Sequence, residues 1–157
     1  MNVPHRRRLT ALVLVALAAG CLSATPEPGA AFIGFYEATE SVDTVQPGFM
    51  GHRADMVPLS LLRGNFADVV VNDGVCLLPA DAVGNTLSLH QSHCVRPVEQ
   101  GAHVDLSILS GQATLSGRNL TLTATGTFDL IPPADAGAGG PQPASGTFAL
   151  TITGTRQ

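Results

Sequence analysis

Residues 113–125 read ATLSGRNLTLTAT, and this stretch decides the fold class. Leu120 and Leu122 point to one side of an extended chain, whereas the threonines between them point to the other. An alternation of period two over this length is typical of strands with one buried and one solvent-facing side. The stretch therefore predicts two antiparallel strands joined by a tight turn near Gly117.

The same pattern recurs on both sides of this stretch. Residues 146–154 predict a last strand whose large side chains, Phe148 among them, face inward. Residues 66–78 predict a hairpin that turns at an Asn-Asp-Gly sequence ending at Gly74, because these residue types tolerate a positive φ. We expect the second strand of this hairpin to end at Pro79.

Further strands are predicted at residues 31–39, 86–91 and 104–109, and a weaker one at residues 54–62. Pro58 interrupts the weak strand, which suits the edge of a sheet. Eight to nine strands joined mainly by short turns predict an all-β fold, an antiparallel up-and-down meander. A small closed β-barrel is favoured over a two-sheet sandwich, because closure removes exposed strand edges.

A loop is predicted at residues 132–144, which are rich in glycine, proline and alanine and have no periodicity. The strands that flank this flexible loop share a Gly-Thr-Phe sequence, at residues 126–128 and 146–148. This shared pattern indicates a hairpin of two similar strands around a long loop.

The first predicted strand contains Gly34-Phe35-Tyr36, which resembles the Gly-x-Trp opening of lipocalins with Tyr in place of Trp. The resemblance implies a lipocalin-like barrel. Gly34, Ala113 and Ala124 could then leave space inside it for a ligand.

The N-terminus carries an export signal. Three arginines at residues 6–8 precede an apolar run at residues 9–19, the layout of a secretory signal peptide. The run is too short for a permanent membrane span, which needs about 20 apolar residues. Residues 17–21, Leu-Ala-Ala-Gly-Cys, resemble the lipobox of bacterial lipoproteins, which implies cleavage before Cys21 and lipid attachment to it.

This resemblance sets the expected domain organisation and location. Residues 1–20 form the signal peptide, residues 21–30 the lipidated cysteine and its tether, and residues 31–157 a single all-β domain. The protein is expected in the cell envelope, anchored by the lipid on Cys21. Leu22 follows the cysteine in place of Asp, which by resemblance favours the outer membrane over the inner membrane.

Removal of the signal also changes the charge. The remaining residues contain five arginines and no lysine against twelve acids, a formal charge of −7. Such a surface repels phosphate backbones, so nucleic-acid binding is not expected. We expect a monomer.

Cys76 and Cys94 form an even pair once Cys21 carries lipid. In an exported chain such a pair predicts a disulfide. The alternative is a thiolate metal site that includes His90 or His93.

A metal-dependent enzyme would use His90, His93 and His103. His90 and His93 are three residues apart, and on a strand an odd spacing places two side chains on opposite faces. The alternative to a metal site is therefore three histidines on the protein surface. His52 with Asp55 could imitate a base and its carboxylate partner, but no Gly-x-Ser-x-Gly nucleophile motif accompanies it.

The acidic residues form no pattern that is typical of a catalytic acid–base pair. Glu37 with Glu40, and Asp68 with Asp73, are close pairs, and in so acidic a chain we expect them on the surface. The sequence therefore predicts no enzyme and no cofactor.

Four functions remain open. The favoured one is a non-enzymatic, lipid-anchored envelope protein that binds a partner protein or a small ligand. The alternatives are a carrier of an apolar small molecule, an inhibitor of an enzyme at the envelope, and a metal-dependent enzyme at His90, His93 and His103.

Overall fold

The alternating residues form strands, as their pattern predicts. The computed structural model describes residues 27–98, 101–134 and 140–157. Within these residues it contains nine strands, one 3-10 turn (η1) and no α-helix. The elements are η1 Ala30–Phe32, β1 Gly34–Gln46, β2 Phe49–Arg63, β3 Val69–Asn72, β4 Leu77–Val83, β5 Thr86–Leu89, β6 Ser92–Pro97, β7 His103–Ser116, β8 Asn119–Ile131 and β9 Ala144–Arg156.

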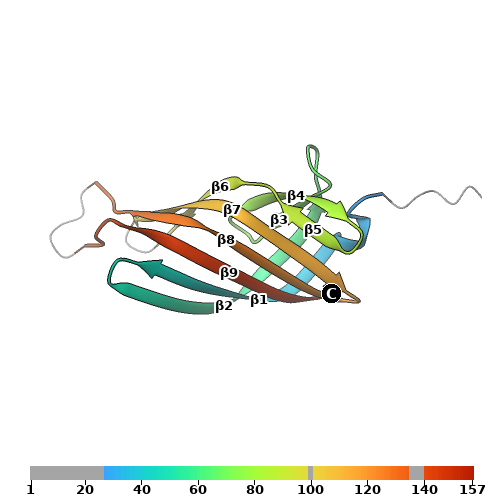
Figure 1. Ribbon diagram of the computed structural model, residues 1–157, viewed down its shortest axis with the longest axis horizontal. Helices are drawn as coiled ribbons and strands as arrows, with labels where there is room; N and C mark the ends of the chain where they lie inside the picture. The colour runs from blue at the N-terminus through green and yellow to red at the C-terminus, as the bar shows by residue number, and fades with distance from the viewer. Residues whose placement is uncertain (1–26, 99–100, 135–139) are drawn as a thin grey trace, which may run out of the picture.

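All nine strands belong to one antiparallel sheet. Their order is β5-β4-β3-β2-β1-β9-β8-β7-β6, so neighbours along the chain are mostly neighbours in the sheet. The first and last strands pair with each other, and β5 pairs with β7, which closes the sheet into a ring (Figure 1). The predicted antiparallel meander of eight to nine strands is confirmed.

Ring closure is uneven along the strands. β7 pairs with β5 near its C-terminal end and with β6 through His103–Ile108. β2 pairs with β3 only through Ser60–Arg63. The sheet is therefore a continuous ring at one end, and at the other a trough of six strands with β2 and β6 as its edges. We call the trough the open half (residues 40–58, 92–97, 103–109, 126–131 and 144–150) and the rest of the sheet the closed half.

The closed half is filled by side chains. The hydroxyl of Tyr36 donates a hydrogen bond of 2.7 Å to the carbonyl oxygen of Phe32 in η1. Arg156, from the last strand, donates to the carbonyl oxygen of Ala31. The largest fully buried side chains are Phe32, Leu59, Leu61, Leu87, Leu120, Leu122, Ile152, Val69 and Val71.

The small residues of this half do not leave the space that the sequence suggested. A methyl group added at Gly34 would lie 2.7 Å from the Arg156 side chain. Ala113 and Ala124 are buried, and Leu89 packs against the neighbouring backbone of Gly111. Side chains from β9 and β5 thus occupy the volume beside Gly34 and Gly111.

The β1–β2 hairpin is longer than expected. The sequence predicted strands at residues 31–39 and 54–62, with a polar connection between them. Instead the two strands pair from Gly34 to Gln46 and turn at Pro47 and Gly48, so the polar stretch is itself β structure. Pro58 lies where β2 has one neighbouring strand, in agreement with its predicted edge position.

The remaining hairpins follow the sequence closely. β7 and β8 turn at Gly117, whose φ is +61°, and β3 and β4 turn at the Asn-Asp-Gly sequence. Pro79 does not end β4 as predicted. It pairs with Val70, and on the other side its carbonyl oxygen accepts the N–H of His90 at 2.8 Å, just beyond β5, so the strand continues through the proline although its ring nitrogen has no hydrogen to donate. β8 ends at Ile131 and β9 begins at Ala144, which bounds the predicted loop, although residues 135–139 lie outside the described residues.

Candidate functional site

The open half encloses a pocket of about 460 Å³. It lies inside the trough, between the β1–β2 hairpin on one side and β6 on the other, with the turn between β3 and β4 beneath. Its walls are mainly aliphatic and aromatic, and its floor carries three charged groups. The apolar lining comprises Val42, Val75, Leu78, Val98, Val104, Leu106, Ile108, Phe148 and Leu150.

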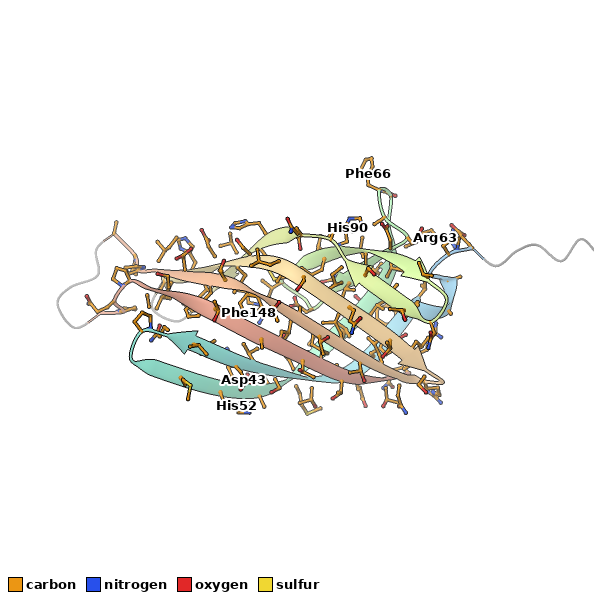
Figure 2. All side chains as sticks on the ribbon, in the orientation of Figure 1. Asp43, His52, Arg63, Phe66, His90 and Phe148 are labelled. Atoms are coloured by element: carbon orange, nitrogen blue, oxygen red, sulfur yellow. A yellow bond between two sulfur atoms is a disulfide. The ribbon has the colours of Figure 1, made fainter. Side chains whose placement is uncertain are left out.

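The walls of the pocket are formed by the inward-facing residues of β1, β7 and β9. Ile108 of β7 lies in register with Phe148 of β9 across Gly126 of β8, and the lining residues of β7 and β9 continue the alternation that fills the closed half. Figure 2 labels Phe148 on β9. β3 and β4 oppose this half only at the floor, through their turn and Leu78, so the inward side chains above line a hollow.

Phe148 is held by a reciprocal aromatic–glycine pairing. Gly126 of β8 lies opposite Phe148, and Phe128 lies opposite Gly146. A methyl group on Gly126 would come 2.7 Å from the ring of Phe148, and one on Gly146 would come 2.9 Å from the ring of Phe128. The two Gly-Thr-Phe sequences are thus one motif, in which each ring covers the glycine of the other strand.

The floor of the pocket holds an ion triad. The Arg96 guanidinium, on β6, donates to both carboxylate oxygens of Glu40, on β1, at 3.0 and 3.1 Å. The same guanidinium also donates to Asp73, in the turn between β3 and β4. The side chains of Glu40 and Asp73 are each 6% exposed. We call Glu40, Asp73 and Arg96 the triad.

Local structure fixes the position of Asp73. Its Oδ1 accepts the backbone N–H groups of Val75 and Cys76 at 2.9 and 2.7 Å. Gly74 adopts a φ of +92°, which its lack of a side chain permits. The turn therefore presents the second carboxylate oxygen to Arg96.

A sulfur pair ties the same turn to the same strand. The sulfur atoms of Cys76 and Cys94 lie at bonding distance, with Cα atoms 5.6 Å apart, as the sequence predicted. Cys94 precedes Arg96 by two residues on β6, so both side chains point to the interior. The turn and β6 are thus joined twice, where no strand pairing joins them.

The triad is electrostatically unbalanced, with two carboxylates and one guanidinium. Burial by itself lowers the pKa of Arg96, but the hydrogen bonds and charges of Glu40 and Asp73 outweigh it, and the net pKa is raised. The guanidinium is therefore permanently charged, and the triad carries a formal charge of −1. The Nε of Arg96 is buried without a hydrogen-bond partner in the described part of the chain.

The candidate residues from the sequence lie elsewhere. His90 pairs with Asp81 at 2.9 Å, whereas His93 and His103 each lie 3.9 Å from the carboxylate of Asp105. Across residues 27–98, 101–134 and 140–157 there is no group of three such side chains able to hold a metal ion. The structure therefore does not gather the three histidines into one site.

The base and carboxylate suggested at His52 and Asp55 are also apart. His52 binds Asp43 at 2.7 Å on the exposed face of the β1–β2 hairpin, where Figure 2 labels both residues, and Asp55 pairs with Arg53. These pairs lie on the rim of the trough or outside it.

Sequence reasoning missed the triad. Glu40 and Asp73 were expected on the surface and are buried, which corrects that prediction. The sequence did contain a sign that these side chains point inward. Glu40 continues the alternation of Tyr36 and Ala38, and Arg96 lies two residues after Cys94 and so on the same face of its strand. Nothing in the sequence paired the two, because they lie 56 residues apart.

Cys21 and the predicted signal peptide, residues 1–20, lie outside the described residues. In the part of the chain that is described, no helix has the length and apolar character to span a membrane. No family model matches the chain, and no curated protein and no solved structure shows significant similarity to it.

Proposed function

We propose that this protein binds a small, largely apolar molecule in the pocket of the open half, without catalysing a reaction on it. One observation carries the proposal: a hollow of about 460 Å³ with apolar walls and a few fixed polar groups at its floor. Binding sites for small molecules typically measure about 300–1,000 Å³ and have this composition. Of the functions open from the sequence, the small-ligand carrier fits this geometry best.

The non-enzymatic part of the proposal rests on the triad. Both oxygens of Glu40 accept hydrogen bonds from Arg96, and both oxygens of Asp73 are also engaged. Hydrogen bonds from a guanidinium draw on the negative charge with which a carboxylate would take up a proton, so these two groups are poorly suited to act as general bases. The triad is better suited to orient a bound molecule.

The test compares two tryptophan substitutions on β1. Val42 lines the pocket, whereas Val45 lies three residues away on the opposite face and is 50% exposed. We expect the neutral fluorescent probe N-phenyl-1-naphthylamine to bind the native domain. Val42→Trp should weaken that binding at least about tenfold by filling the pocket, and Val45→Trp should leave it unchanged. Absence of probe binding to the native domain, or equal binding to both variants, would refute the proposal.

We also propose that a lipid on Cys21 holds the protein in the cell envelope, with the outer membrane favoured. The described chain begins at Glu27, which pairs with Arg63 beside the closed half, whereas the pocket lies in the other half. The first described residue therefore lies at the end of the sheet away from the pocket. Cys21→Ser should move the protein from the membrane fraction to the soluble fraction of the expressing bacterium, and retention in the membrane fraction would refute the anchor.

A further inference from the structure

The charge of the triad indicates which polar group the ligand carries, an inference that rests on the proposed function. The two carboxylates are each more than nine-tenths buried, at the floor of an apolar pocket. They share a single guanidinium, which leaves a formal charge of −1. Inside a protein such a charge acts more strongly than in water, because little solvent screens it.

Neighbouring charges do not cancel this excess. Asp55 lies opposite Glu40 in the β1–β2 pair, but its carboxylate is paired with Arg53. Arg53 reaches the rim of the pocket with a side chain that is 74% exposed, so water screens its charge. His52 also reaches the rim of the pocket, but its side chain is 63% exposed and is paired with Asp43. The uncompensated charge therefore belongs to the triad.

Glu40 is the member of the triad that can accept from a ligand. A carboxylate offers about four acceptor positions, and each oxygen of Glu40 uses one for Arg96. Asp73 is more fully engaged, since it accepts two backbone N–H groups and one guanidinium N–H. An N–H donor entering the pocket would thus meet open lone pairs on Glu40.

We propose that the ligand is an amphipathic amine, whose ammonium group binds Glu40 at the floor and whose apolar part lies against Leu106, Ile108 and Phe148. A cation in this position neutralises the triad, and ammonium–carboxylate hydrogen bonds are among the strong ones. An anionic head, as in a fatty acid, would place a third negative charge beside two buried carboxylates. A neutral alcohol gains the apolar contacts and can donate one hydrogen bond, but it brings no charge to offset that of the triad.

The test uses three ligands with the same chain: decylamine, decanol and decanoate. Each displaces N-phenyl-1-naphthylamine from the native domain at neutral pH, and the dissociation constants are compared. We expect the amine to bind at least about tenfold more tightly than the alcohol, and the alcohol more tightly than the carboxylate. Equal affinities for the three, or a preference for the carboxylate, would overturn the inference and leave the proposed function standing.

Two glutamine variants locate the effect. Glu40→Gln reduces the charge of the triad to zero and should abolish the preference for the amine while keeping the affinity for the alcohol. Glu37→Gln makes the same change three residues earlier on the exposed face of β1 and should alter neither constant. An undiminished preference in Glu40→Gln would refute the role of the triad.

The comparison of the three ligands uses the native domain alone, so it tests the inference even if the variants do not fold. If Glu40→Gln does not fold, the series is extended with decyltrimethylammonium, which keeps the charge but has no N–H donor. Intermediate affinity would support both the charge and the hydrogen bond to Glu40. Failure of the fluorescent probe and of all ligands to bind refutes the proposed function instead.

Discussion

The closed and open halves of this sheet use the same strands and the same alternation of residues, yet one is packed and the other is hollow. Leu122 of β8 is fully buried against the strands that close the ring. Leu106 of β7, with the same inward orientation, lines a pocket. Alternation determines which side chains point inward, but packing also requires an opposite wall, and only the closed half has one.

The two halves are also held together by different interactions. In the closed half, β5 and β7 complete the ring through backbone pairing. In the open half, the contacts across the trough are the ion triad and the sulfur pair, both of which end on β6. Side-chain contacts thus take the place of strand pairing and keep the interior accessible.

The largest effect is expected from removing the cation of the triad. Arg96→Met leaves two buried carboxylates without their partner, which should lower the free energy of unfolding by about 3–5 kcal/mol in urea denaturation. The double variant Arg96→Met with Glu40→Met should recover part of this loss, because one carboxylate leaves with the guanidinium. A single variant as stable as the native domain would mean that the triad does not hold the open half.

Matched leucine truncations test the packing difference directly. Leu122→Ala should cost about 3–4 kcal/mol, because it creates a cavity in a filled core. Leu106→Ala should cost only about 1–2 kcal/mol, because it enlarges a space that already exists. Equal losses in urea denaturation would show that the open half is packed like the closed half.

The sulfur pair is predicted to contribute somewhat less than the triad. Cys76 and Cys94 are 18 residues apart, and a disulfide closing such a loop stabilises by about 3 kcal/mol. Replacing both with serine should lower the thermal midpoint and, by freeing the turn that carries Asp73, speed the release of the fluorescent probe. Unchanged release by stopped-flow fluorescence would confine the role of the pair to stability.

The smallest effect concerns Tyr36 in the closed half. Burial raises its pKa above the ordinary value of 10.0, and the nearby charge of Arg156 opposes this more weakly. The folded state therefore retains the phenol proton when the unfolded chain has begun to lose it. This stability is present below about pH 10 and is lost as the pH rises through the folded-state pKa.

Two measurements check this prediction. Tyr36 is the only tyrosine of the chain, so tyrosinate absorbance reports it alone and should show a raised midpoint in the folded domain. Tyr36→Phe should cost about 1 kcal/mol at neutral pH through the lost hydrogen bond to Phe32, and should weaken the alkaline decline. An ordinary midpoint would contradict the burial of the phenol.

Much of the fold could be predicted because it is local. The Gly117 turn, the Asn-Asp-Gly turn and the inward face of β9 all follow from residues within one hairpin. The prediction failed for the polar part of the β1–β2 hairpin. There the strands form an edge of the trough, so one side of the pair can carry charged residues without burying them.

The site was less predictable than the fold. The alternation that places Leu122 in a core also places Glu40 inward, but a carboxylate at such a position is stable only with a partner. That partner is Arg96, on the opposite edge of the trough. The small residues Ala113 and Ala124 are buried in the closed half, whereas the pocket lies in the open half.

The sequence by itself determined the class of fold, the inward face of the regular strands and the pairing of Cys76 with Cys94, since these depend on period, turn chemistry and cysteine count. Only the tertiary structure decided that the ring closes at one end, and that Glu40, Asp73 and Arg96 meet at the floor of a pocket. The physical reason is that closure and charge pairing depend on contacts between strands far apart in the chain, which no local pattern specifies.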